Sequence, residues 1–159
     1  MSTFLRTVEF LGLSVWLGSD VFLSFVMAPG AFHLLGSRDQ AGKLVGFALG
    51  HMHILGIACG LLLLLVRLIR TQAFASLVTP AALCVVLMIT LTAVSQYTVS
   101  AKMAELRLQM GSIQATAADS PLVTEFSRLH RLSVSLESGV LLTGIAAVYL
   151  MVRELASSR

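Results

Sequence analysis

The residues of this sequence that could do chemistry are the ionisable and polar side chains inside its long apolar runs. In the last run, His130, Ser133 and Glu137 recur at spacings of three and four, which places them on one face of a helix, with Arg128 and Arg131 roughly opposite. A charged side chain facing lipid costs about 2.5–3.5 kcal/mol on insertion scales. We therefore expect Glu137 to face protein, water or a ligand.

Each of the other three runs contains a similar candidate. Asp20 lies about halfway through the first run, so we expect it to point inward. In the second run, His53 shares one helical face with a series of glycines, whereas His51 points about 160° away from it. These glycines are Gly42, Gly46, Gly50, Gly56 and Gly60. Such a face lets a neighbouring helix or a flat ligand approach closely. Gln96 ends a mildly polar stripe in the third run, which predicts hydrogen bonding between helices.

The composition is that of a membrane protein. The 159 residues are 57% apolar and 12% charged, with a mean hydropathy of +0.89, whereas soluble domains contain about 25% charged residues. Four runs, at about 8–33, 44–66, 75–99 and 132–152, exceed or approach the roughly 20 residues needed to cross a bilayer. We predict a single all-α transmembrane domain over residues 1–159, an up-down bundle of four transmembrane helices. The Lys and Arg residues lie near the ends of the runs, which excludes a nucleic-acid surface and leaves the lipid bilayer as the expected partner.

Several local signals predict how these helices begin and end. Pro29-Gly30 predicts a kink or the end of the first helix, with residues 31–36 as an exit turn. Residues 67–72 predict a short basic connection. An apolar pattern that continues past residue 99 predicts an extended third helix, followed by a polar loop over residues 111–120.

The charges near the helix ends bear on orientation. We expect Glu9 at the membrane interface close to Arg6. Five Lys and Arg residues lie on the side of the termini and six on the other side. If Arg128 and Arg131 belong to a helix, the balance favours cytoplasmic termini.

The polar residues are compatible with several functions. One is a purely structural set of hydrogen bonds between helices, and another is a proton or transition-metal site made by His53, His130 and Glu137 with Asp20. A third is haem b held by the imidazoles of His53 and His130. A fourth is a scaffold that binds a membrane partner helix, or a second copy of the chain, through the glycine face. The sequence lacks the standard catalytic motifs, so an enzyme would depend on a cofactor that the sequence does not reveal.

Several segments together resemble a known family. They are Trp16-Leu17-Gly18, Pro29-Gly30-Ala31-Phe32, Ala41-Gly42, His53 and the run Phe126-x-x-x-His130-x-x-Ser133. With these segments the chain resembles the bacterial domain-of-unknown-function membrane family related to eukaryotic transmembrane protein 205. The resemblance implies a four-helix integral membrane protein without an established enzymatic activity. The eukaryotic relatives are associated with tolerance of platinum drugs, which points to metal or thiol handling.

The resemblance extends to some of the candidate site residues. His53, His130 and Ser133 match family residues, and Gln96 stands near a family Asn. Glu137 departs from the pattern, since the relatives have Asn there. The Trp-x-Gly opening is also similar to that of copper-resistance D proteins and of haem-binding protoporphyrinogen oxidases. Those proteins carry a histidine about two turns before the Trp, where this chain has Glu9, which counts against simple haem transfer.

Overall fold

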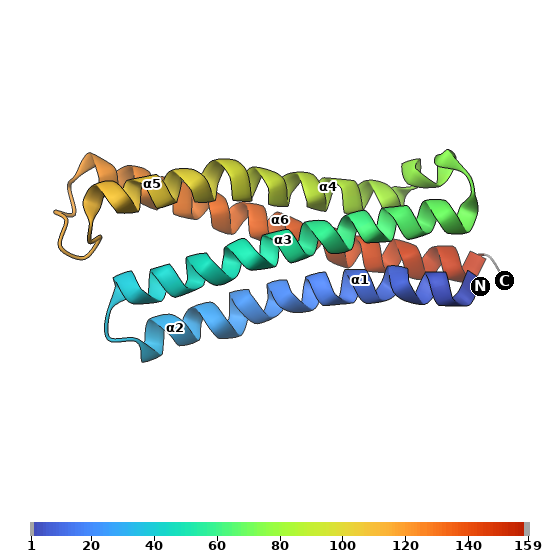
Figure 1. Cartoon of the computed structure of the whole chain (residues 1–159), viewed down its shortest axis with the longest axis horizontal. Helices are drawn as coiled ribbons and strands as arrows, with labels where there is room; N and C mark the ends of the chain where they lie inside the picture. Colours follow the sequence, from blue (N-terminus) through green and yellow to red (C-terminus); the bar gives the residue numbers. More distant parts are fainter. Residues whose placement is uncertain (1, 158–159) are drawn as a thin grey trace.

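The structure, a computed structural model of the whole chain, describes residues 2–157 and is all-helical over that range, which confirms the predicted fold class. In chain order the elements are α1 (Ser2–Phe22), the π-helical segment η1 (Leu23–Met27), α2 (Ala28–Leu34), α3 (Arg38–Thr71), the 3₁₀ turn η2 (Phe74–Val78), α4 (Pro80–Val94), the π-helical segment η3 (Ser95–Ser100), α5 (Ala101–Met110) and α6 (Pro121–Ser157). In the first helix of the bundle α1, η1 and α2 join end to end, and in the third α4, η3 and α5 do so. Four long rods result, and α1 begins at the end of the bundle where α6 finishes (Figure 1).

Each rod is long enough and apolar enough to cross a membrane. The rods contain 32, 34, 31 and 37 residues. At about 1.5 Å per residue the 34-residue helix is roughly 51 Å long, against a hydrocarbon core of about 30 Å. The helix ends therefore project into the headgroup regions. The extended third helix, the polar loop after it and the start of the fourth helix at Pro121 agree with the sequence, in which Ser120-Pro121 is typical of a helix start. This helix begins eleven residues before the apolar run at about 132–152.

The Pro29-Gly30 pair does not end the first helix, because the helical path continues to Leu34. Proline lacks the N–H that a helix interior needs, and its ring collides with the carbonyl four residues earlier. Here Pro29 occupies the first turn of α2, directly after the wider π-helical segment η1. This wider turn accommodates the proline, so residues 31–34 stay helical instead of forming an exit turn.

The predicted basic connection at residues 67–72 is also wrong over most of its length. Helix α3 continues through Arg67 and Arg70 to Thr71, and only Gln72 leaves it, with a left-handed φ of 52°. Basic side chains in the last turn of a helix are favoured by the helix dipole. Both arginines also reach carboxylates on other helices, which stabilises this last turn.

The core lies between two helix pairs, since α1 packs along α3 and α4 packs along α6 (Figure 1). Trp16, Met88 and Val140 are fully or almost fully buried at its centre. The outer surface is apolar, with side chains such as Phe22 and Leu142 exposed by 58% and 68%. Apolar groups on the outside and tightly packed residues inside are what a lipid environment requires.

The glycine face of α3 is covered by side chains of the same chain. A Cβ atom at Gly56 would lie 2.3 Å from Trp16 Nε1, and one at Gly60 would lie 2.7 Å from Trp16 Cζ3. Farther along the face, Gly50 faces Gln96, while Gly42 and Gly46 face the guanidinium of Arg107. A partner helix would have to displace these side chains to use the face that the sequence suggested for it.

We predict that Gly56→Ala lowers the stability of the protein in detergent by about 1–3 kcal/mol, the usual range for overpacking a core. The added methyl group would overlap the Trp16 indole, which is bounded on all sides by the core. Thermal or SDS unfolding monitored by circular dichroism measures the effect.

Gly18→Ala is the matched control, because Gly18 is also helical and nothing lies within 4 Å of the added Cβ. Its stability should be unchanged or slightly higher, since Ala favours a helix by up to about 1 kcal/mol over Gly. Equal losses in the two variants would contradict the packing assignment.

Candidate functional site

A chain of hydrogen bonds joins three helices at the level of His53. His53 is fully buried, and its Nε2 lies 2.7 Å from Glu137 Oε1 on α6. Its Nδ1 lies 2.7 Å from Gln96 Oε1 on η3. Ser95, the neighbour of Gln96, donates to the same carboxylate oxygen, Glu137 Oε1, at 2.9 Å. Each side chain thereby satisfies polar groups of the others inside the bundle.

Asp20 adds a second carboxylate to this cluster from the first helix. It is 1% exposed and lies near enough to His53 and Glu137 for their charges to interact. Ser24, which is one turn later on the same helix, donates to Asp20 Oδ1 at 3.4 Å. Within the described part of the chain, Asp20 Oδ2 and Glu137 Oε2 are buried and have no hydrogen-bond partner. Both carboxylates thus have an oxygen free to bind something else.

The four helices bring these residues to one depth because each residue lies near the middle of its rod. Asp20, His53, Gln96 and Glu137 are all 14 to 20 residues from either end of the four apolar helices. The residues therefore lie about halfway along the bundle, inside the apolar runs and away from both of its ends, where an unsatisfied polar group is costly. We call Asp20, His53, Ser95, Gln96 and Glu137 the midplane cluster.

Both π-helical segments lie beside the midplane cluster. η3 contains Ser95 and Gln96, and η1 begins three residues after Asp20. A π-helical turn holds an extra residue and shifts the following side chains around the helix axis, and such turns occur frequently at functional sites. In η3 this places Ser95 and Gln96, which are adjacent in sequence, in contact with Glu137 and His53 respectively.

His53 can adopt either charge state in this arrangement. The Gln96 Oε1 atom and the Glu137 carboxylate both accept hydrogen bonds, so with these contacts both ring nitrogens donate and His53 is an imidazolium. If the Gln96 amide turns over, its NH₂ group donates to Nδ1 and the ring is neutral. The two states differ by one proton and by a rotation of the Gln96 amide, so the cluster can gain or lose a proton without a change in the backbone.

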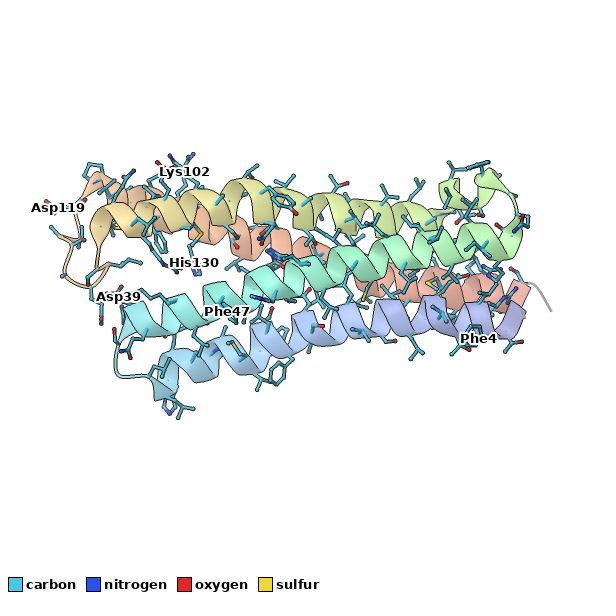
Figure 2. All side chains as sticks on the ribbon, in the orientation of Figure 1. Phe4, Asp39, Phe47, Lys102, Asp119 and His130 are labelled. Atoms are coloured by element: carbon cyan, nitrogen blue, oxygen red, sulfur yellow. The ribbon has the colours of Figure 1, made fainter. Side chains whose placement is uncertain are left out.

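The charged run that opens α6 is not a single unit. Ser133 is 5% exposed, whereas His130, on the same helical face, is exposed. Figure 2 shows His130 towards the end of the bundle where the two helix pairs diverge. Arg128 is exposed and pairs with Glu125 of its own helix at 2.7 Å, so it neutralises neither Glu137 nor Asp20.

The structure joins two of the three predicted metal ligands, His53 and Glu137, and leaves His130 outside their contact. Among residues 2–157, no three His, Cys, Asp or Glu side chains are placed to hold a metal ion. Axial ligation of haem by His53 would require one of its two hydrogen bonds to be replaced. The geometry accordingly supports a hydrogen-bonded cluster more directly than it supports either cofactor.

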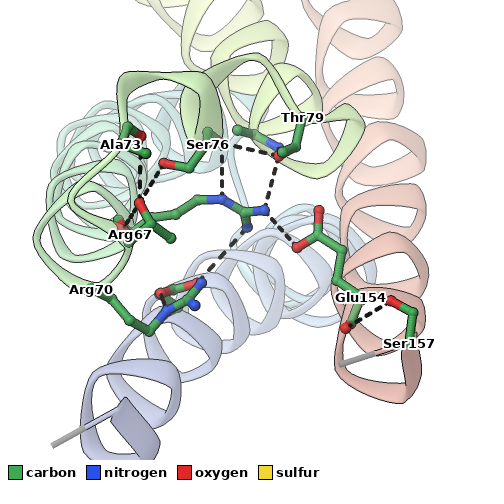
Figure 3. Close-up of polar contacts among 10 residues, drawn as sticks. Arg67, Arg70, Ala73, Ser76, Thr79, Glu154 and Ser157 are labelled. Carbon is green, nitrogen blue, oxygen red and sulfur yellow. Dashed lines mark hydrogen bonds and ion pairs between the residues drawn. The ribbon is translucent and has the colours of Figure 1, made fainter. Parts of the chain in front are cut away.

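A second polar cluster, which the sequence analysis missed, lies where α3 and α6 end (Figure 3). Glu9 is 2% exposed and accepts from Arg70 Nε at 2.6 Å, so near the end of the bundle it is buried in an ion pair between helices. Arg67 is 3% exposed and donates to Ser76 O, to Thr79 Oγ1 and to Glu154 Oε2. In the sequence this cluster shows only as two arginines three residues apart and a glutamate inside another apolar run, a pattern that also fits a basic connection and an interfacial glutamate.

The comparisons with known proteins give one match. A protein-family model described as "Domain of unknown function (DUF4149)" matches residues 11–112. This range includes Asp20, His53 and Gln96 but ends before α6, which provides Glu137. No curated protein and no solved structure matches the chain.

We predict a large coupling between His53 and Glu137 in a double-mutant cycle of His53→Ala and Glu137→Ala. A buried hydrogen bond that involves a charged group contributes about 1.5–3 kcal/mol, and the cycle isolates that contribution. SDS unfolding of the four proteins in detergent micelles measures it. The control cycle uses Lys102 and Glu105, an exposed pair at 2.9 Å, where we expect less than about 1 kcal/mol. Similar coupling in both cycles would contradict a buried bond.

Proposed function

Taking as premise that the chain belongs to the family described as "Domain of unknown function (DUF4149)", we propose that it is a non-enzymatic membrane protein whose midplane cluster binds a proton inside the bilayer. His53, Glu137 and Asp20 hold this proton among them. Ser95 and Gln96 orient the groups that exchange it. Ionisable side chains in the interior of membrane bundles commonly have such roles in proton relays.

The charge balance of the midplane cluster is the main support for this proposal. It contains two carboxylates and one imidazole, and among residues 2–157 no Lys or Arg forms an ion pair with Asp20 or Glu137. With both carboxylates ionised and His53 protonated, one negative charge remains. Because an unbalanced charge at this depth is strongly disfavoured, the cluster takes up a further proton. The two unpartnered carboxylate oxygens are available to hold it.

The proton also influences how the helices contact each other. Glu137 holds α6 to His53 of α3 and to Ser95 of η3, and Asp20 belongs to the first helix. Protonation of Glu137 weakens the attraction between its side chain and the His53 imidazolium. Loss of this proton restores the attraction. Proton occupancy is thereby linked to the packing of all four helices, which is how this site would act on a partner or a transported species.

We predict that Fourier-transform infrared difference spectra, recorded between two pH values on the purified protein in lipid, contain a carbonyl-stretch signal of a protonated carboxylic acid. Glu137→Gln and Asp20→Asn should each remove or shift that signal, because the two carboxyls share one environment. Glu125→Gln should leave it unchanged, since Glu125 is paired with Arg128 at the surface.

A spectrum that neither Glu137→Gln nor Asp20→Asn alters would refute proton binding by the midplane cluster. Elemental analysis and an absorption spectrum of the same preparation separate this outcome from the two cofactor hypotheses. A stoichiometric metal ion or a Soret band that His53→Ala abolishes would favour the metal or haem site instead.

We propose further that the protein spans a bacterial inner membrane with its termini in the cytoplasm, and that its family is related to eukaryotic transmembrane protein 205. Support for the relation comes from Phe126, His130 and Ser133, all beyond the matched residues 11–112. For the orientation, α6 begins at Pro121 and includes Arg128 and Arg131, while α3 includes Arg67 and Arg70 on the side of the termini. With both pairs set aside, three Lys and Arg residues remain on the side of the termini and four on the other side, so the fusion experiment decides the orientation.

For this orientation we predict that a C-terminal green fluorescent protein fusion is fluorescent and that a C-terminal alkaline phosphatase fusion is inactive, because the second enzyme needs the oxidising periplasm. Insertion of either reporter into the loop at residues 111–120 should reverse both results. An active C-terminal phosphatase fusion would show the opposite orientation.

A further inference from the structure

A cavity opens at the end of the bundle where α1 begins and where α3 and α6 finish. Its volume is about 310 Å³, at the lower end of the range for small-molecule sites. The polar cluster of Figure 3 forms one wall, and Phe10, Met151 and Leu155 contribute apolar surface. The depth of the cavity along the helices is that of the lipid headgroups, since the lining residues lie in the first turns of α1 and in the last turns of α3 and α6.

The described part of this cavity's lining is rich in arginine. It includes three arginines, Arg6, Arg67 and Arg70, and two glutamates, Glu9 and Glu154. Two of these arginines are held in place by two atoms each. Arg67, which is buried, donates through Nε and Nη2 to Ser76 and Glu154, and Arg70, which is partly buried, donates through the same two atoms to Glu9. Fixed guanidinium groups of this kind are suited to recognise phosphate oxygens.

Each of these arginines also retains unused donors. Arg67 Nη1 lies 3.9 Å from Glu9 Oε2, too far for a hydrogen bond. Within residues 2–157, Arg70 Nη1 has no hydrogen-bond partner either. The carboxylate of Glu9 therefore orients both guanidinium groups while it leaves one nitrogen of each available to a ligand that accepts hydrogen bonds.

We propose that this cavity binds the phosphate group of an anionic phospholipid, through Arg67 Nη1 and Arg70 Nη1. The headgroup depth favours a lipid over a soluble anion, and the apolar part of the lining accommodates the glycerol and the start of the acyl chains. The same donors would accept inorganic phosphate, so the experiment has to separate the two sources. The site is independent of the proton site, because it lies at the end of the helices and shares no residue with the midplane cluster.

Native mass spectrometry or microscale thermophoresis of the purified full chain tests the proposal. Titration with phosphatidylglycerol should give saturable binding that is at least about fivefold tighter than binding of phosphatidylcholine, since one basic residue near a membrane surface contributes about that factor. Titration with inorganic phosphate should compete only weakly. Saturation by inorganic phosphate at lower concentration than the lipid would overturn the assignment to a lipid. Equal affinity for the two lipids, without phosphate binding, would overturn the site itself.

Two variants with opposite expected effects separate ligand binding from a structural role. Arg70→Gln removes the Nη1 donor and one positive charge, so we expect about fivefold weaker binding of phosphatidylglycerol. Glu9→Gln removes one negative charge but keeps a side-chain oxygen that can accept from Arg70 Nε, so the arginines stay oriented and we expect about fivefold tighter binding. A purely structural cluster predicts no gain in affinity for Glu9→Gln.

Arg131→Gln is the matched control, because it removes the same charge from an exposed position near the other end of α6. Its affinity for phosphatidylglycerol should stay within twofold of the wild type. Circular dichroism and size-exclusion chromatography establish that each variant is folded. If Arg131→Gln and Arg70→Gln weaken binding equally, or if Glu9→Gln fails to strengthen it, the cavity is not the lipid site.

Discussion

The buried hydrogen bond between His53 and Glu137 is the interaction on which the rest of the bundle depends. In a bilayer there is no water to satisfy a polar side chain, so each one must find its partner on another helix. This bond joins α3 to α6, and the Gln96 and Ser95 contacts join η3 to the same pair. Apolar packing tolerates many rotations of one helix against its neighbour, whereas these contacts fix both the rotation and the depth of three helices.

The two polar clusters solve the problem of buried charge in different ways. At the end of the bundle, Arg67 and Arg70 face Glu9 and Glu154, so opposite charges neutralise each other close to the aqueous boundary. The midplane cluster has an excess of acidic groups about halfway along the bundle, inside the apolar runs. The first arrangement is compatible with a stable ion-pair network, and the second requires a proton or another cation for neutrality.

The helical framework provides the positions that these clusters need. Trp16 packs on Gly56 and Gly60, which lets the first helix approach α3 closely enough for Asp20 to interact with the charge of His53. The π-helical segments η1 and η3 occur next to the same layer. Close approach and local rotation together bring short polar side chains from four helices to one point inside the membrane.

The sequence by itself determined the class of the protein and the faces of its helices. Its apolar runs required four spanning helices, and the cost of charge in lipid required Asp20 and Glu137 to point inward. Only the tertiary structure decided which partners they meet. Helical periodicity placed His130 and Glu137 on one face, but the helix pairs diverge, so Glu137 reaches His53 while His130 is exposed. Glu9 and Arg67 likewise resembled interfacial anchors until the fold brought them together, because the pairing of charges depends on distances between helices that one-dimensional spacing does not contain.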